Sequence, residues 1–433
     1  MKKYLFLFLA AVGSIYAGGL TLNDCVNEAL QNNKEVAIVK AAWDAGKART
    51  NLVKAAYFPQ INASLSYSRR VSPLSLSFGD NIPSIPGLGD TIDAASYTAG
   101  LSAQMMLWDF GRTGSGEKQA FAAEQSAKLR YEKKKQEVAY NVKKSYYSVL
   151  QAKSLAELSG SILKEMKNLY ESVRERKAQG LATAVDVLNA ESEYLKAEGD
   201  ATKAKRQAEL ALDSLALSMG KNTGESPALS GEEILKVEEF PLGLKNFEEC
   251  SAAALNSRLD FKEAELQIEA AEASVAAAYA DWLPTFSGNA SYDYSSSKFP
   301  PDKASYSYGL NFSVPVFSGF SSSAKLSVAE SDQRSASASR ETLKQSLLAQ
   351  IKSNYFKALN DKEYSRVVSK KVQYLNKNYE AVNAKYGVGL ATLTELIDAE
   401  VKKASGEVEN RQSLFNYWLS VNELEYSIGG KVK

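Results

Sequence analysis

Gly180-Leu-Ala-Thr183 recurs in this chain as Gly389-Leu-Ala-Thr392, at a spacing of 209 positions (389 − 180). Each copy runs into a capping-box sequence, which ends at Asp186 in the first copy and at Glu395 in the second. A glycine placed just after a helix favours the left-handed conformation that ends the helix. Both segments therefore predict a turn between two helices, and the chain is expected to contain two helical hairpins.

The similarity extends outward from these turns over most of the chain, which indicates an internal duplication. Two further pairs of segments match at the same spacing of 209 positions: Tyr146-Tyr147 with Tyr355-Phe356, and Trp108-Asp109 with Phe317-Ser318. Two pairs nearer the start of each copy match at a spacing of 225 positions (284 − 59): Leu22 to Leu30 with Phe247 to Leu255, and Tyr57-Phe58-Pro59 with Trp282-Leu283-Pro284. Between Pro59 and Trp108 the first copy holds an insertion, Val71 to Ala95, that is rich in Ser, Pro and Gly. Insertions are tolerated at loop tips, so this segment is expected to be the tip of a loop.

The duplication predicts the organisation of the whole chain. Residues 1–17 have the pattern of a secretory signal, because Lys2 and Lys3 precede an apolar run that ends at the small residue Ala17. Residues 18–219 and 246–428 are the two repeats, each with a helix, two strands and a long helical hairpin. Residues 220–245 are expected to connect the repeats, and residues 429–433 form a C-terminal tail.

Four stretches alternate between apolar and polar residues, as a strand with one apolar face does: Gln60 to Ser68, Tyr97 to Leu107, Thr285 to Tyr294 and Tyr306 to Val316. A soluble antiparallel sandwich shows the same alternation. Two features favour a lipid-facing sheet, since each stretch has the roughly 9–12 residues that cross a bilayer and tyrosines gather toward the loop ends. The expected membrane-interface aromatic residues are Tyr67, Tyr97, Tyr292, Tyr294, Tyr306 and Tyr308.

Four strands are too few to close a barrel, and an open sheet edge in lipid leaves backbone groups without hydrogen-bond partners. The chain is therefore expected to oligomerise in a membrane. Eight, twelve or sixteen strands, from a dimer, a trimer or a tetramer, all satisfy this requirement. After residue 17 no run of about 20 apolar residues offers a transmembrane helix.

Two segments favour helices much longer than a globular core requires. Glu117 to Gln179 is interrupted only by Gly160, and Ser321 to Tyr386 contains neither Gly nor Pro. Apolar residues recur at heptad spacing at Val368, Val372, Leu375, Tyr379, Val382 and Tyr386 and again at Leu414, Tyr417, Val421, Leu424 and Ile428. The pattern predicts coiled coil, and the signal segment and the strands argue against a cytoplasmic rod.

The composition excludes several classes of function. Among 433 residues, 52 are basic and 51 acidic, which gives no support to nucleic acid as a partner. Histidine is absent, so the commonest general base and transition-metal ligand is missing, and no enzymatic activity, cofactor or metal is expected. Cys25 and Cys250 occupy the same position of the two repeats and are expected to be small buried residues, although the compartment would permit a disulfide between them.

On these residues the chain resembles the TolC-like outer membrane efflux protein family over nearly all of its mature length. The resemblance rests on the duplication, on the Pro59 and Pro284 joints, on Trp108-Asp-Phe-Gly-Arg112 and on the turn segment Tyr386-Gly-Val-Gly-Leu-Ala-Thr392 with its first-repeat counterpart. It implies a mixed α and β membrane protein whose three chains form a twelve-stranded barrel, continuous with a long periplasmic α-helical coiled-coil barrel. The function that it implies is an outer membrane exit duct of a tripartite efflux pump or type I secretion system.

The resemblance also implies partners and sites. The partners are the other chains of a homotrimer, outer membrane lipid, and a periplasmic adaptor protein that joins the duct to an inner-membrane pump. The periplasmic entrance would use Asp186, Tyr386, Glu395 and Asp398, the last two as an acidic ring, although Glu395 is equally explained as a capping residue. The arginine that often accompanies them is replaced by Ala391, so a less tightly latched entrance is expected. The adaptor would dock on the hairpin tips, at Gly180, Leu181, Ala182, Thr183, Val388, Gly389, Leu390, Ala391 and Thr392.

A structural or adhesive surface protein made of strands and coiled coil is the alternative. Such a protein would carry a single membrane segment at one end of the chain. The duplicated strand pairs, with both hairpins turning back at the same place, favour the duct. A secreted hydrolase has no constellation of nucleophile, base and acid to support it.

Overall fold

The structure is a computed structural model that describes residues 19–73, 91–222, 224, 227–230 and 246–430. The predicted signal segment and most of the predicted connector between the repeats lie outside the described residues, as does the tip of the long loop between the first two strands. Within the described residues, no helix is both long enough and apolar enough to cross a membrane.

Two compact units make up the chain, and each draws on both predicted repeats. Unit 1 comprises residues 1–40, 129–261 and 342–433, and unit 2 comprises residues 41–128 and 262–341. The repeats are therefore units of sequence, whereas the compact units combine matching parts of the two repeats.

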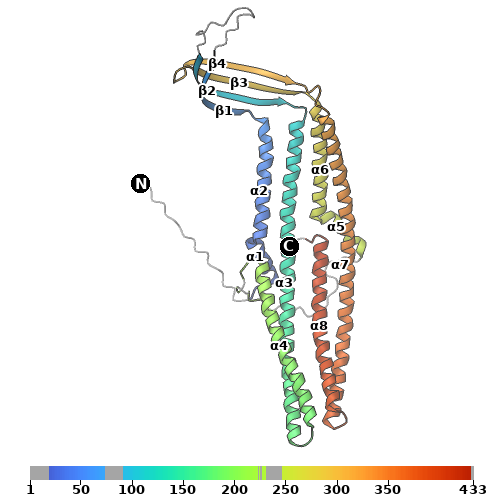
Figure 1. Cartoon of the computed structure of the whole chain (residues 1–433). Coiled ribbons are helices and arrows are strands. Elements are labelled where there is room, and N and C mark those ends of the chain that lie inside the picture. The colour runs from blue at the N-terminus through green and yellow to red at the C-terminus, as the bar shows by residue number, and fades with distance from the viewer. Residues whose placement is uncertain (1–18, 74–90, 223, 225–226, 231–245, 431–433) are drawn as a thin grey trace, which may run out of the picture. The chain divides into compact units, whose positions relative to one another are not determined.

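The helices and strands form two series of the same order (Figure 1). The first series is α1 (Leu22–Asn32), α2 (Lys34–Lys54), η1 (Ala55–Tyr57), β1 (Gln60–Pro73), β2 (Thr91–Trp108), α3 (Arg112–Ala178) and α4 (Ala184–Ser218). The second series is α5 (Phe247–Ser257), α6 (Leu259–Tyr279), η2 (Ala280–Trp282), β3 (Thr285–Ser296), β4 (Lys303–Ser313), α7 (Ser321–Gly387) and α8 (Leu393–Ser427). The long helices α3 and α7 both have 67 residues, and α4 and α8 both have 35.

Each series opens with two helices, where the sequence predicted one. Asn33 and Arg258 interrupt the helical path in extended conformation, with ψ of 123° at both positions. The Asn33 side chain accepts a hydrogen bond from the backbone N–H of Glu35 (2.8 Å), which starts α2 where α1 ends. Arg258 donates to the Asp260 carboxylate (3.0 Å). The single-helix prediction was wrong because these local side-chain bonds compete with the helical backbone.

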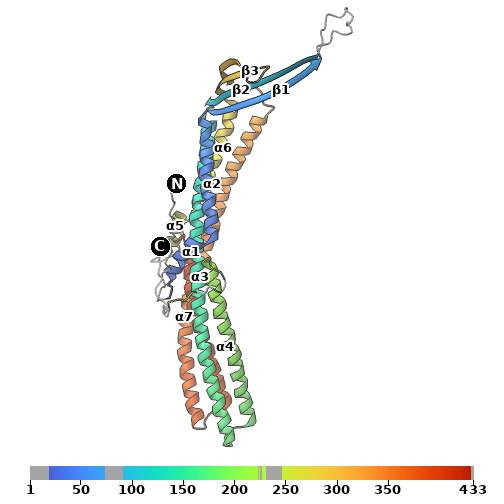
Figure 2. The same ribbon diagram turned by 90° about the vertical axis from the view of Figure 1, so that its left-hand side faces the viewer.

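In unit 2 the four strands pair antiparallel in the order β1-β2-β3-β4, and Figure 2 shows β1 and β2 running together. The register places the apolar residues of all four strands on one face, which confirms the alternation. One row on this face reads Ala63, Leu101, Tyr292 and Tyr306. The adjacent row on the opposite face reads Asn62, Ser102, Ser291 and Ser307. A one-residue slip in any pair would mix the two faces.

Two strand ends differ from the prediction. β1 continues to Pro73 and β2 begins at Thr91, so both ends of the segment expected as loop, Val71 to Ala95, are paired sheet. β4 ends at Ser313, although the alternation continues beyond it. Pro315 accounts for this end, because proline has no backbone N–H to donate to a strand ladder.

Unit 1 contains the turns of both helical hairpins, α3 with α4 and α7 with α8, at the same end of the unit (Figure 1, Figure 2). Gly160 lies within α3 and does not interrupt it. Among the predicted heptad positions, Val368, Tyr417, Val421 and Leu424 are buried, and Tyr379, Val382 and Tyr386 are partly buried against an apolar cluster near the turns. The predicted packing faces of α7 and α8 are therefore confirmed.

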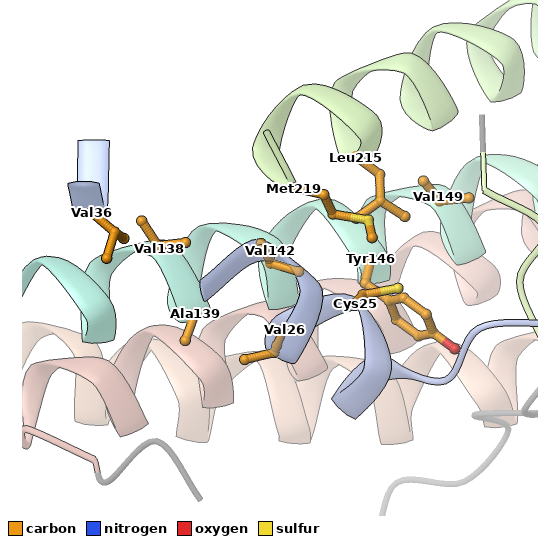
Figure 3. Close-up of a cluster of buried hydrophobic side chains, with 11 residues drawn as sticks. Cys25, Val26, Val36, Val138, Ala139, Val142, Tyr146, Val149, Leu215 and Met219 are labelled. Atoms are coloured by element: carbon orange, nitrogen blue, oxygen red, sulfur yellow. The ribbon is translucent and has the colours of Figure 1, made fainter. Parts of the chain in front are cut away.

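Two buried clusters in unit 1 anchor the ends of the two series. The first joins α1 to α3 and α4 (Figure 3), and its members include Cys25, Val142, Leu215 and Met219. The second joins α5 to α7 and α8, and its members include Cys250, Ile351, Leu424 and Ile428. Each named residue of the first cluster corresponds to one of the second. The two cysteines are 225 positions apart (250 − 25), and the other three pairs are each 209 positions apart, as Val142 and Ile351 are (351 − 142).

Both cysteines are free and buried, which confirms that they are core residues rather than a disulfide pair. Burial raises the pKa of the Cys25 thiol to about 11. The thiol therefore stays protonated at neutral pH and is a poor nucleophile.

Candidate functional site

The two hairpin turns share one backbone geometry. Gly180 and Gly389 have φ of 75° and 76°, in the left-handed region that their place after a helix predicted. The N–H of the next residue, Leu181 in one turn and Leu390 in the other, donates across the turn to a carbonyl five residues earlier, at 2.8 Å in both. The backbone therefore fixes both turns, independently of the side chains that they carry.

Both predicted capping boxes are present. The Thr183 hydroxyl accepts from the N–H of Asp186 (3.1 Å), whose carboxylate accepts from the N–H of Thr183 (2.8 Å). Thr392 and Glu395 repeat this exchange at 3.2 and 2.8 Å. Hydrogen bonds from the backbone and then the side chain of the threonine lower the pKa of Asp186 and of Glu395. These two of the three predicted entrance carboxylates are thus held as anions at the first turn of a helix.

Asp398 and Tyr386 also have partners within the chain. The Asp398 carboxylate pairs with the Lys402 ammonium one turn along α8, at 2.6 Å. The Arg176 guanidinium of α3 lies over the Tyr386 ring, 4.6 Å from its centroid. The arginine beside Tyr386 is therefore supplied by the first hairpin. Among the described contacts, the Asp186 carboxylate hydrogen-bonds Thr183 of its own capping box and not Tyr386.

An apolar cluster joins the two hairpins next to their turns. Val173 of α3 and Ala190 of α4 pack with Leu393 and Leu396 of α8, and Ala182 and Tyr386 pack at its edge. Beyond the cluster the predicted docking tips carry exposed apolar side chains. Leu181, Val388 and Leu390 are 72%, 72% and 78% exposed.

Away from the turns, α3 and α8 run antiparallel and contact each other through aromatic rings and through charge. Tyr140 of α3 stacks on Tyr426 of α8 with 4.5 Å between ring centroids, and the next stacked pair, Tyr147 with Trp418, has its centroids 6.4 Å apart. Nearer the turns the Lys403 ammonium of α8 pairs with the Glu165 carboxylate of α3 at 3.0 Å.

A groove of 520 Å³ lies between α3, α4 and α8, in the interval between the stacked rings and the Glu165 pair. Many of its lining side chains are small: Ala152, Ser159, Ala197, Ala204, Ala404 and Ser405. Side chains of this size do not fill the space between the three helices over several turns. The contact between the hairpins is therefore discontinuous along α3 and α8.

The apolar face of the sheet in unit 2 ends in aromatic residues on its loop side. Tyr67 lies opposite Tyr97, with 4.9 Å between ring centroids. The hydroxyls of Tyr292 and Tyr294 are 3.2 Å apart. Just beyond the Tyr67 row, Arg69 and Asp93 form an ion pair with two hydrogen bonds, of 2.8 and 2.5 Å. The apolar face therefore stops at the row of tyrosines.

The edge strand β4 and the other end of the sheet complete this surface. Tyr306, Tyr308 and Leu310 of β4 are 75%, 82% and 83% exposed. At the end away from the loops Trp108 lies opposite Phe286, and Phe286 contacts Phe312 with 4.6 Å between ring centroids. Aromatic side chains thus border the apolar face at both ends.

In the part of the chain that the structure describes, no three His, Cys, Asp or Glu side chains are grouped so that they could hold a metal ion. Two surfaces of the molecule invite a functional account: the exposed apolar sheet face and the paired hairpin turns.

Comparison with known proteins decides between the families that such surfaces could serve. Residues 25–221 and 251–429 match the outer membrane efflux protein family. The chain belongs to this family. Outer membrane protein OprJ of Pseudomonas aeruginosa is 23% identical, over 94% of this chain and 84% of its own length. Cation efflux system protein CusC of Escherichia coli K12 is 25% identical, over 94% and 85% of the two chains.

The fold of this outer membrane efflux protein is also that of solved structures. A membrane protein from Pseudomonas aeruginosa superposes with a TM-score of 0.84 at 22% identity, over 94% of this chain and 92% of that chain. As a member of the family, the chain resides in the outer membrane and acts there as an exit duct for efflux. The predicted family, location and function are confirmed.

The turns and the caps of this efflux protein could be predicted from its sequence, whereas the residues that link the two hairpins could not. Arg176 and Glu165 lie on α3, and their partners are on the second hairpin; Lys403 is 238 positions from Glu165. Hydrophobic periodicity carries no information about such pairs, because their positions are defined only when α3 and α8 come together. Lys403 could have been noticed only as a charge beside the packed face of α8.

Proposed function

We propose that three copies of this efflux protein close a twelve-stranded barrel in the outer membrane and conduct cargo through it passively, without catalysis. The observation that carries the proposal is the sheet. Its edge strands β1 and β4 each pair on one side only within the described strands, and its apolar face is exposed. In lipid such edges require partners, which further copies of the same chain supply.

The dimensions of the apolar face fit a bilayer. Strand β2 advances eleven residues from Tyr97 to Trp108, which is about 36 Å along the strand at roughly 3.3 Å per residue. Tilted by roughly 45°, this length spans about 25 Å, the height of the apolar band on an outer membrane barrel. The rows of Ser, Asn and Gln on the opposite face then line a water-filled lumen.

The internal repeat supports the trimer in this proposal. The hairpins α3–α4 and α7–α8 of one chain have nearly the same structure, because their helices have equal lengths and their buried clusters use matching positions. Three chains then supply six similar hairpins around one axis, which form the wall of a periplasmic tunnel with the turns at its entrance.

At this entrance Glu395 and Asp398 form the proposed acidic ring. Glu395 serves the cap of α8 as well, and the two roles are compatible because a capping carboxylate keeps its charge. Asp398 is paired with Lys402, but both side chains are exposed, and an exposed pair of this spacing contributes only about 0.3–0.5 kcal/mol. A permeating cation therefore still encounters the field of the ring.

The tips and the entrance also carry the proposed protein contacts. A periplasmic adaptor would bind the exposed apolar tips at Leu181, Val388 and Leu390, since such side chains favour a partner surface. Asp186 and Tyr386 would hold neighbouring hairpins closed, with Arg176 stacked on the tyrosine within one chain.

Purified protein in a planar lipid bilayer tests the function. We expect trimers in mild detergent and discrete cation-preferring channels in the bilayer. Glu395→Ala with Asp398→Ala should weaken the cation preference and the block by multivalent cations, while Glu209→Ala, an exposed residue of α4 far from the turn, should not. A stable soluble monomer that forms no channels would contradict the duct. Unchanged selectivity in an assembled double variant would contradict the acidic ring alone.

A further inference from the structure

The ammonium group of Lys403 contacts side chains of three helices, α3 of the first hairpin and α7 and α8 of the second. Its ammonium lies 3.0 Å from the Glu165 carboxylate of α3 and 3.8 Å from the Glu400 carboxylate of α8. It also lies 4.8 Å from the ring centroid of Tyr379 on α7. The Lys403 side chain is 16% exposed and that of Glu400 is 6% exposed, whereas that of Glu165 is 46% exposed. Water therefore screens the Lys403–Glu400 contact weakly and the Lys403–Glu165 contact more strongly.

Glu400 completes this cluster from inside the bundle. Its residue is 4% exposed, and its carboxyl group lies close enough to the Tyr379 hydroxyl and the Glu165 carboxyl group for both to affect its charge. Burial raises the pKa of Glu400, and the neighbouring Glu165 raises it further. The Tyr379 pKa is also raised, by burial and by Glu400, so the phenol remains a donor.

We propose that Lys403, Glu165, Glu400 and Tyr379 form a tie between the hairpins, and that this tie sets how far they separate at the entrance. The inference deepens the proposed duct and rests on it. The tie lies between the small-residue groove and the turns, where the α3–α8 contact has few other supports. Charged groups with weak solvent screening bind strongly, yet the loss of a single member leaves the others unpaired.

The protonation state of Glu400 determines how the strength of the tie changes with pH. With Glu400 protonated, the charge of Glu165 alone balances that of Lys403. When Glu400 ionises, two carboxylates share one ammonium, and α3 and α8 repel each other. Because the pKa is raised in the folded state, this stabilisation is present in acid and is lost as the pH rises through that pKa. The hairpins are therefore held more tightly in acid.

Other charged groups around the tie do not reverse this direction. Glu407 of α8 lies beside Lys403, and burial raises its pKa as well, so its ionisation also adds negative charge to the cluster as the pH rises. From α4, Glu193 and Lys196 border the adjoining groove. They pair with each other at 3.5 Å and leave no net charge there.

Single-channel conductance and the spacing of spin labels at the two turns test the tie in the full-length trimer. Lys403→Met keeps the length of the side chain and removes its charge, and we expect it to raise the open fraction about tenfold and to widen the spacing. Lys371→Met is the matched control. Lys371 also pairs with a glutamate of α8, Glu409, at 2.7 Å, but this pair lies within the second hairpin. It should behave as the wild type does.

Two further variants keep the test decisive if Lys403→Met assembles poorly. Exchange of the charges, Glu165→Lys with Lys403→Glu, should restore the closed spacing that either single change loses. Glu400→Gln cannot ionise and should keep the hairpins close at every pH, whereas the wild type opens as the pH rises. Wild-type spacing in Lys403→Met, or equal widening in Lys371→Met, would overturn the tie while leaving a conducting trimer. A failure of the duct itself would instead show as the absence of channels in the wild type.

Discussion

The sheet of unit 2 and the α3–α8 contact of unit 1 are built on different principles. On the apolar face of the sheet every row carries apolar or aromatic side chains, and within the described strands charge enters this face only at the Arg69–Asp93 pair beyond the tyrosines. Along α3 and α8, stacked rings give way to small residues and then to the charged cluster around Lys403. A regular surface has one stable arrangement, whereas a discontinuous contact can change where its supports are few. The sheet is therefore the fixed part of the duct, and the hairpin contact is the adjustable part.

A charge in the middle of the apolar face should have the largest effect on either region. Leu101 lies four residues below the tyrosine row of β2 and is 54% exposed. Leu101→Arg should prevent assembly in the outer membrane, because arginine near the midplane costs about 2–4 kcal/mol in each of the three chains. The yield of folded trimer on a gel without heating measures this.

Ser102→Arg is the control for this change, because the next residue of β2 faces the polar side, in the row of Asn62 and Ser291. It should assemble normally and alter only conductance. Equal loss of trimer in both variants would mean that the two faces of the sheet do not meet different surroundings.

Truncation of the apolar cluster at the turns should have the next largest effect. Leu396 is 3% exposed among Val173, Ala190 and Leu393. Leu396→Ala should lower the free energy of unfolding of the hairpins by about 3 kcal/mol, through lost burial and the cavity left behind. Thermal unfolding followed by helical circular dichroism measures it.

Leu188→Ala provides the comparison for Leu396→Ala, because Leu188 on α4 is 63% exposed. Its loss should change the unfolding temperature little. A variant of Leu396 as stable as that of Leu188 would show that the cluster does not hold the hairpins.

Prediction from sequence succeeded where structure follows a repeated pattern. The alternation of β1 to β4 fixed which residues share a face, because one register alone keeps the faces separate. The turns were predictable because Gly180 and Gly389 each meet a local requirement of the backbone. By contrast, the tie at Lys403 depends on residues hundreds of positions apart, and the break at Asn33 depends on one side-chain bond. Neither leaves a periodic trace in the sequence.

Removal of either cap should have a smaller effect, equal at the two turns. Thr183→Ala and Thr392→Ala each remove one side of a capping box, which costs about 1 kcal/mol of helix stability. Hydrogen exchange of the amides in the first turn of α4 and of α8 should accelerate to the same degree. A much larger response at Thr392 would show that Glu395 is needed at the entrance beyond its role in the cap.

The smallest effect is expected from acid at these same caps, and it has the opposite sign to the tie. The pKa values of Asp186 and Glu395 are lowered from 3.8 and 4.5 by the threonine hydrogen bonds. Their stabilisation is therefore fully present above those ordinary values and is lost as the pH falls through the lowered ones. Both carboxyl groups are exposed, so only the first turns of α4 and α8 should loosen, below about pH 4. Hydrogen exchange in Glu395→Gln, which keeps an acceptor but does not titrate, should lack this acid response at α8 and retain it at α4. If acid instead protected the first turn of α8 in the wild type, the cap would not control this turn, and the contrast with the acid-tightened tie would disappear.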